Sequence, residues 1–281
     1  MFDILYKYSR KVMSPQLYKK LQLSFLGRLR TWDTINTYKS IFEQYKKNTP
    51  FELRDKVVVE IGTGPQLFTA LYFLQHGAKQ VIVVDPKISE DWYKEQLCSF
   101  LDKFREQNPA FSLSADDVKS KIVVESDLNQ IDRSYEGNID LLVSHLVLEH
   151  FDSLPTFFRN LQRLLAINGV SYNLVDLTDH TYHPFGKFKL FEKIPVSRSF
   201  FHLRYSDTKF RYLNDSKCYM NRKLLPVYIE MAQEYGFVAE IDNRVFALKA
   251  KIHKDVMNSF KSRDNKDIHT ASFSISLQRK P

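Results

Sequence analysis

The sequence is poor in the residues that cross-link a chain or anchor it in a membrane. Its 281 residues include only two cysteines, Cys98 and Cys218, and their separation does not match a metal site. This excludes a disulfide scaffold, and we expect both cysteines to be reduced thiols. No run of about 18 apolar residues is present, and the N-terminal segment carries charges where a signal peptide is apolar. We therefore expect a cytoplasmic protein without stable membrane insertion.

The overall composition is that of a folded protein. Hydrophobic residues make up 43% of the chain and charged residues 26%, which excludes a disordered or fibrous protein. A length of 281 residues suits one large domain with an appendage.

Basic residues gather near the N-terminus. The chain has a net charge of +8, and residues 1–50 hold ten lysines and arginines against three acidic residues. Apolar residues at helical spacing predict helices over residues 3–30 and 32–47. We therefore predict a basic helical cap over residues 1–50 and the main domain over residues 51–281. The basic face is either solvated or a surface for nucleic acid, anionic lipid or a phosphorylated substrate.

After the cap, strand-like and helical segments alternate. The runs that predict strands cover residues 57–61, 80–85, 121–126, 139–145, 169–176, 238–242 and 270–278. This alternation predicts βαβ units and a parallel sheet covered on both faces. Residues 181–223 fit no regular pattern, and their length suits a lid or substrate-binding insert above the sheet.

Two of only eight glycines, Gly62 and Gly64, directly follow the first predicted strand. Such a turn brings the backbone close to a ligand. The dinucleotide fingerprint requires a third glycine where Leu67 stands, and no G-K-[ST] of a P-loop follows. The second strand ends at Asp85, 21 residues after Gly64, where an ionised carboxylate suits a ribose diol. The glycine turn alone leaves the class of nucleotide open.

Five segments resemble, in order, the motifs of class I S-adenosylmethionine-dependent methyltransferases. They are VVVEIGTGPQ, VIVVDP, ESDL, SHLVLEHF and LLAINGV, the last of which resembles the turn before the fifth strand. The resemblance covers residues 55–245, with a terminal strand at 270–278, and departs from the family at Gln66, where a glycine is common. It implies an α/β fold with a doubly wound, mostly parallel seven-stranded sheet, an antiparallel terminal strand, an N-terminal helical cap and an insert after the fifth strand.

The resemblance implies a site for S-adenosylmethionine at the ends of the first four strands, formed by Glu60, Gly62, Gly64, Asp85, Asp127, Leu128 and His145. The two glycines would pass close to the methionine part, with Glu60 supporting the loop or the amino group. Asp85 would accept hydrogen bonds from both ribose hydroxyls. Asp127 and Leu128 would hold the adenine, and His145 would lie near the sulfonium. For each acid, the alternative role is a helix cap or a surface charge.

Candidate catalytic groups follow the fourth and fifth strands: His150, Asp176, Asp179 and His180. Methyl transfer mainly requires alignment of the reactants, and a base is needed only when the acceptor carries a proton. We predict His180 as that base, oriented by Asp176 or Asp179, with His150 as the second candidate. Alternatively, the histidines bond backbone groups, or Asp176, Asp179 and His180 bind a divalent metal; their spacing does not require one, so no metal site is predicted.

The acceptor is predicted from weaker signals. SHLV stands where base-directed relatives carry Asn/Asp-Pro-Pro-aromatic, which argues against DNA, and no RNA-binding module is visible. Arg204 and Arg222 in the insert suit a phosphate or carboxylate. VDLTDH resembles a D-x-x-D-H segment of small-molecule methyltransferases in bacterial glycan and secondary-metabolite pathways. We therefore predict an O- or N-methyltransferase for a small polar, anionic acceptor in a biosynthetic pathway such as glycan biosynthesis.

Three other functions remain open. An RNA methyltransferase would use the basic N-terminus and would lose binding steeply with salt. A nicotinamide-dependent oxidoreductase is opposed by Leu67, and a non-catalytic nucleotide-binding domain would explain Gln66. The sequence determines neither the acceptor atom nor the oligomeric state.

Overall fold

The structure of the protein is a computed structural model. It describes residues 35–64, 66–178, 200–213, 219–247, 260 and 265–280. The predicted helical segment 3–30 lies outside these residues, as do Asp179 and His180.

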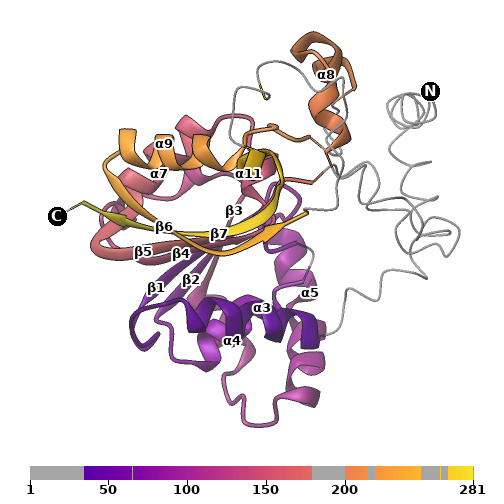
Figure 1. The fold of residues 1–281 in the computed structure, drawn as a ribbon. Coiled ribbons are helices and arrows are strands. Elements are labelled where there is room, and N and C mark those ends of the chain that lie inside the picture. Colours follow the sequence, from indigo (N-terminus) through magenta and orange to yellow (C-terminus); the bar gives the residue numbers. More distant parts are fainter. Residues whose placement is uncertain are drawn as a thin grey trace, which may run out of the picture.

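Seven strands of the described chain form one sheet in the order β3-β2-β1-β4-β5-β7-β6 (Figure 1). They are β1 Val57–Ile61, β2 Gln80–Val84, β3 Ile122–Glu125, β4 Ile139–His145, β5 Leu165–Asp176, β6 Phe237–Phe246 and β7 Thr270–Arg279. The first five pair in parallel, whereas β7 pairs antiparallel with both β5 and β6. The predicted doubly wound sheet with an antiparallel terminal strand is confirmed. Its strand order reverses between β1 and β4, where ligands bind in such sheets.

The fifth strand begins earlier than the sequence pattern predicts. Leu165 already pairs with Ile139, and the register then shifts before the regular ladder begins. A Cβ at Gly169 would lie only 2.7 Å from the Ile139 carbonyl oxygen, so glycine is needed where the two strands approach. LLAINGV is therefore an irregular start of β5 rather than a turn.

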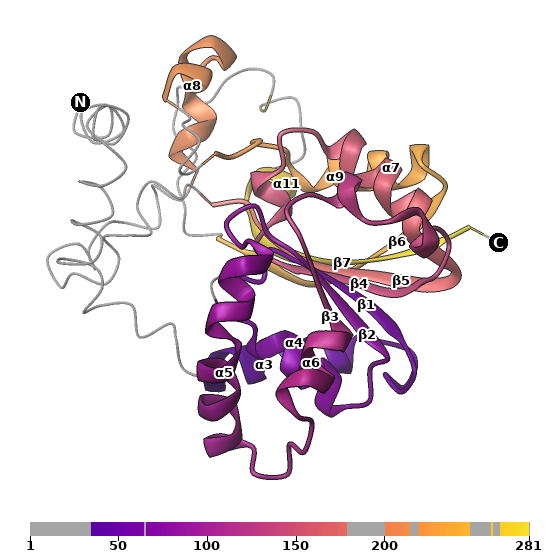
Figure 2. The ribbon, with the colours of Figure 1, turned by 180° about the vertical axis from the view of Figure 1, so that it is seen from behind.

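Helices cover both faces of the sheet (Figure 2). They are α3 Ile35–Lys47, α4 Phe68–Gln75, α5 Glu90–Gln107, α6 Ala115–Lys121, α7 Leu154–Leu164 and α9 Leu225–Glu234. Because side chains alternate along a strand, neighbouring residues of β1 enter different cores. Val58 packs in the cluster that includes α3 to α6, and Val59 packs in the cluster that includes α7 and α9.

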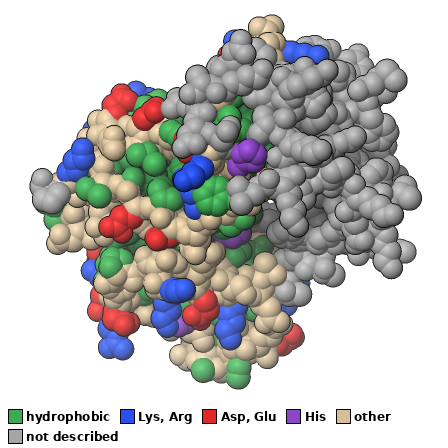
Figure 3. All heavy atoms as spheres, viewed as in Figure 1, with side chains coloured by type: hydrophobic (Ala, Val, Ile, Leu, Met, Phe, Trp, Pro, Cys, Tyr) green, Lys and Arg blue, Asp and Glu red, His purple; other side chains and the backbone are tan. Residues whose placement is uncertain are grey.

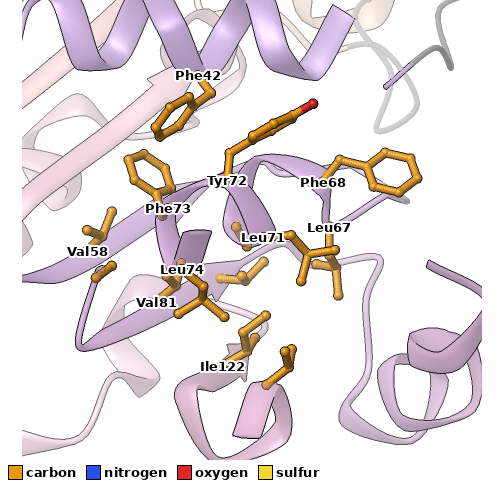
Figure 4. Close-up of a cluster of buried hydrophobic side chains, with 14 of the residues drawn as sticks. Phe42, Val58, Leu67, Phe68, Leu71, Tyr72, Phe73, Leu74, Val81 and Ile122 are labelled. Atoms are coloured by element: carbon orange, nitrogen blue, oxygen red, sulfur yellow. The ribbon is translucent and has the colours of Figure 1, made fainter. Parts of the chain in front are cut away.

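Helix α3 is part of the first core (Figure 4). Phe42 is fully buried, and its ring centroid lies 5.5 Å from that of Tyr72 and 5.2 Å from that of Phe73, both on α4. Tyr45 is also buried and meets the ring of Tyr172 on β5 edge to face. The predicted boundary at residue 50 thus falls within one continuous core cluster.

Part of the insert is regular, which corrects the expectation that residues 181–223 lack a pattern. It contains the 3-10 helix η7 Phe201–Arg204 and helix α8 Asp207–Leu213. A small buried cluster joins this part to helix α11 Asn265–Ile268 through Phe200, Leu203, Leu224 and Ile268. Because α11 directly precedes β7, and Ser272 of β7 pairs with Asp176 at the end of β5, the cluster anchors the insert at the carboxyl edge of the sheet.

On the face shown in Figure 3, acidic and basic side chains of the described residues are interspersed. None of the helices in the described ranges is both long and apolar enough to span a bilayer.

Candidate active site

The turn after β1 needs both of its glycines to be in the left-handed region, with φ of 71° at Gly62 and 70° at Gly64. The Gly62 amide donates to the Val84 carbonyl at 2.8 Å, which ties the turn to β2. A Cβ at Gly62 would lie 2.4 Å from Cγ2 of Val147, which belongs to the loop after β4. Glycine therefore lets the loops after β1 and β4 lie against each other.

Asp85 follows β2 and is only 6% exposed. Its Oδ2 accepts a hydrogen bond from the Gly64 amide at 3.0 Å, and its Oδ1 accepts one from the Lys87 amide at 2.9 Å. An ionised carboxylate has about four lone-pair sites, so each oxygen retains an acceptor position for a further donor. Asp85 thus holds the glycine turn and remains able to accept from a diol.

Glu60 lies on β1, two residues before Gly62, and is 3% exposed. The Thr63 hydroxyl donates to its Oε2 at 3.0 Å. The pKa of Glu60 is raised to about 7, mainly by burial and to a smaller extent by the nearby Asp85, while hydrogen bonds from Thr63 and Thr69 act to lower it. The Tyr45 phenol lies close enough for Glu60 to raise its pKa as well, after burial as the main cause. Helix α3 therefore borders this acid.

Asp127 and Leu128 follow β3, as the motif requires. Asp127 is exposed and caps the 3-10 helix η2 Leu128–Gln130, because its Oδ1 accepts from the Asn129 amide at 2.7 Å. Leu128 is buried in the second core cluster. The capping role is thus present, and a contact of these two residues with adenine remains a prediction.

His145 is the last residue of β4. Burial lowers its pKa to about 4, so its imidazole is neutral near pH 7. The chain then turns sharply, with a φ of 58° at Leu146, whose amide donates to the Leu174 carbonyl of β5 at 2.8 Å. The turn directs the loop that carries Val147 back over Gly62.

His150 ends the 3-10 helix η4 Leu148–His150, which follows this loop. Its Nδ1 is hydrogen-bonded to the Tyr219 carbonyl, 69 residues away. Asn221 joins the same two segments, since its amide donates to the Glu149 carbonyl at 2.8 Å and its Nδ2 to the Leu148 carbonyl at 2.8 Å. The structure thus places His150, the second candidate base, against the end of the insert, where the chain returns to the sheet.

Asp176 ends β5, and its Oδ1 accepts from both the amide and the hydroxyl of Thr178, at 2.8 and 2.7 Å. Its predicted partners Asp179 and His180 lie outside the described residues. Within the part of the chain that is described, no three His, Cys, Asp or Glu side chains gather as metal ligands.

Arg222 is 8% exposed and bonds to the insert itself. Its Nη1 donates to the carbonyls of His202 and Tyr205, and its Nη2 pairs with Asp207. Its guanidinium also stacks 4.2 Å from the Phe210 ring centroid. These contacts favour a structural role, and a substrate contact of Arg222 remains a prediction.

The side chain of Arg204 is not among those the structure describes. Sequence reasoning missed Tyr219 and Asn221, because neither belongs to a motif and both act through contacts with residues far away in the sequence.

The geometry of the first two loops fits a nucleoside cofactor. Among the described residues, the turn is open beside Gly64, where an added Cβ would meet only the Tyr38 hydroxyl, at 4.0 Å. The carboxylate that can accept from a ribose diol is bonded to the amide of that same glycine. An open backbone turn and an adjacent acid at the strand tips match the donor set of S-adenosylmethionine.

Several solved structures are similar in fold. The geranyl diphosphate C-methyltransferase of Streptomyces coelicolor A3(2) is 11% identical, with a TM-score of 0.48 over 86% of this chain and 77% of that one. The YcgJ protein of Bacillus subtilis is 11% identical, with a TM-score of 0.48 over 88% and 100%. An S-adenosylmethionine-dependent methyltransferase of Mesorhizobium loti is 14% identical, with a TM-score of 0.47 over 88% and 99%.

No curated protein matches the chain significantly. A family model described as a methyltransferase domain matches residues 35–216, which is more than half of the chain and begins where α3 begins. The strand order and the glycine turn agree with that match. The chain therefore belongs to the methyltransferase-domain family, and it is a class I S-adenosylmethionine-dependent enzyme, as its motifs predicted.

Proposed function

We propose that this methyltransferase binds its cofactor across the carboxyl ends of β1, β2 and β3 and methylates an oxygen or nitrogen atom of a small polar acceptor. The observation that carries the proposal is the hydrogen bond from the Gly64 amide to Asp85, which joins the glycine turn to the acid on the next strand. S-adenosylmethionine supplies a methyl group that is already activated by its sulfonium.

The chain's own residues bind and orient the reactants. Asp85 accepts from the ribose hydroxyls, and the turn from Gly62 to Gly64 admits the methionine part without a Cβ in the way. Asp127 and Leu128 flank the adenine position at the end of β3. Neutral His145 and the buried Glu60 line the side toward β4. Alignment of the acceptor is then the main catalytic contribution.

A proton-bearing acceptor also requires a base. His150 supports this role by position, since η4 follows the loop that packs on Gly62. Asp176 ends the neighbouring strand, where it would orient His180 if that residue is the base, as the sequence predicts. A neutral imidazole of either histidine accepts the proton during transfer.

The finer description of the acceptor rests on the sequence. We propose an anionic acceptor, phosphorylated or sugar-linked, in a biosynthetic pathway such as glycan biosynthesis, in a cytoplasmic enzyme. The ten basic residues of positions 1–50 and the arginines of the insert, Arg204 among them, support it. Arg222 supports it less, because its guanidinium already binds the insert.

The experiment that tests the proposal is calorimetric titration with S-adenosylhomocysteine. Asp85→Ala should weaken binding by about 1.5 to 3 kcal/mol, or roughly 10- to 150-fold in Kd, because charge-assisted hydrogen bonds are lost. Asp102→Ala, which removes an exposed carboxylate on α5, is the matched control and should bind like the wild type. Equal affinity of the wild type and Asp85→Ala would remove the ribose role, and absence of binding to the wild type would overturn the site.

A further inference from the structure

We propose that Asn221 is a positioning residue that holds His150 as the Nδ1–H tautomer, so that Nε2 is the nitrogen that receives a proton. This inference rests on the proposed function, because it concerns the base of the same reaction. The inference is based on a set of hydrogen bonds that joins η4 to residues 219–221.

Asn221 donates hydrogen bonds to three backbone carbonyls in and just after η4. Its backbone amide donates to the Glu149 carbonyl at 2.8 Å. Its Nδ2 donates to the Leu148 carbonyl at 2.8 Å and to the Phe151 carbonyl at 3.3 Å. The turn that carries His150 is therefore held on both sides of the histidine by one side chain.

The oxygen of the Asn221 side-chain amide also takes part in hydrogen bonds. Oδ1 of Asn221 accepts from the Lys223 amide at 2.9 Å and from the Tyr228 hydroxyl at 3.5 Å. Tyr228 is fully buried on α9 in the second core. Only asparagine or glutamine offers two donors and an acceptor on one side chain, and asparagine is the shorter of the two. The residue thus fixes η4 to the core of the protein.

This attachment determines which carbonyl faces His150. Tyr219 lies two residues before Asn221, and its carbonyl oxygen is hydrogen-bonded to Nδ1 of the imidazole. A carbonyl can only accept, so Nδ1 must carry the hydrogen, and in the neutral ring Nε2 then holds the lone pair. A neutral histidine in water prefers the other tautomer, so the protein selects the less common form.

The next residue extends the attachment to the insert. Arg222 has a φ of 54° and donates to the carbonyls of His202 and Tyr205 in and after η7. Residues 219–222 therefore connect the η4 turn with the part of the insert that carries α8. Correct placement of the insert and the tautomer of His150 depend on the same four residues.

The tautomer is measured with protein labelled with 15N at histidine, by long-range 1H–15N correlation spectra at about pH 8, where an ordinary histidine is neutral. His150→Gln assigns the signal. The wild type should show His150 as Nδ1–H, and Asn221→Ala should shift it to a mixture in which Nε2–H predominates. Lys223→Ala is the matched control, because its side chain is exposed and only its backbone amide bonds to Asn221.

A second variant separates positioning from folding. Asn221→Asp keeps the size and the acceptor of the side chain but loses both Nδ2 donors, so it should show the same change of tautomer as Asn221→Ala. Nε2–H in the wild type, or unchanged Nδ1–H in both variants, would overturn the proposal. Affinity for S-adenosylhomocysteine should stay within about twofold of the wild type in both variants, because the hydrogen bonds of Asn221 within the described part of the chain go to Leu148, Glu149, Phe151, Lys223 and Tyr228 and not to the glycine turn. Absence of that binding in the wild type itself would instead reject the proposed function, whatever the tautomer.

Discussion

The loops on the two sides of the switch point are held in different ways. On the side of the proposed cofactor site, the turn after β1 is bonded to Asp85, 21 residues further along the chain. On the other side, the η4 turn after β4 is bonded to Tyr219 and Asn221, 69 and 73 residues from their partners. The turn after β1 is held within one βαβ unit, whereas the η4 turn depends on a segment at the end of the insert.

This difference explains why a sequence motif can reveal the turn after β1 but not the contacts of the η4 turn. Residues of one βαβ unit keep a fixed spacing, because the strand, turn and helix have fixed lengths. A contact that spans an insert has no such spacing. The loops after β1 and β4 meet where Val147 approaches Gly62.

The largest expected effect concerns helix α3, which packs on α4, the helix that follows the glycine turn. Phe42→Ala should lower the free energy of unfolding by about 3 to 5 kcal/mol, as for other buried phenylalanines, because Phe42 is fully buried against α4. Urea unfolding measures it, with Lys39→Ala on the exposed face of α3 as the control. A loss below about 1 kcal/mol would mean that α3 is a detachable cap and not part of this core.

Next in size is the contact that joins the loops after β1 and β4. Gly62→Ala should cost about 2 to 4 kcal/mol, because it adds a left-handed alanine and an overlap with Val147. In the double variant with Val147→Ala, the cost should be lower than the sum of the single costs by about 1 to 3 kcal/mol. Gly137→Ala, with a φ of 69° and open space around its Cβ, isolates the backbone cost. Additive costs in urea unfolding would mean that the two loops are independent.

The smallest expected effect concerns Glu60, the buried acid that precedes the glycine turn. Burial raises the pKa of Glu60 from 4.5 to about 7, so the folded state holds this proton more tightly than the unfolded state. Its contribution is therefore complete below about pH 4.5 and is lost as the pH rises through about 7. From pH 5 to pH 8, the wild type should lose about 2 to 3 kcal/mol relative to Glu60→Gln. Parallel pH profiles of the two proteins in urea unfolding would contradict the raised pKa.

The strands and the glycine turn after β1 could largely be read from the sequence. Runs of β-branched residues predicted β1 and β4 to the residue and β2 and β3 to within one, because buried parallel strands are continuous apolar runs. The start of β5 was missed, since exposed Ile167 and the following Asn168 show no strand alternation. Helix α8 was missed because its seven residues are too few to show a helical period.

The loop after β4 and the insert could be read from the sequence only in part. The motif gave His150 a place after the fourth strand, but its partner is a backbone carbonyl, which no residue type signals. Arg222 looked like an anion-binding residue, because the carbonyls of His202 and Tyr205 that occupy it are likewise invisible in a sequence. Positive charge predicts a partner for an arginine without saying whether that partner belongs to the protein.

The placement of β7 between β5 and β6 constrains the order in which the sheet can be completed. β6 pairs only with β7 among the described strands, and β7 is translated after it. A chain that ends before Thr270 would leave β6 without this partner and the free side of β5 open to other chains, so we expect it to aggregate more readily than the full chain.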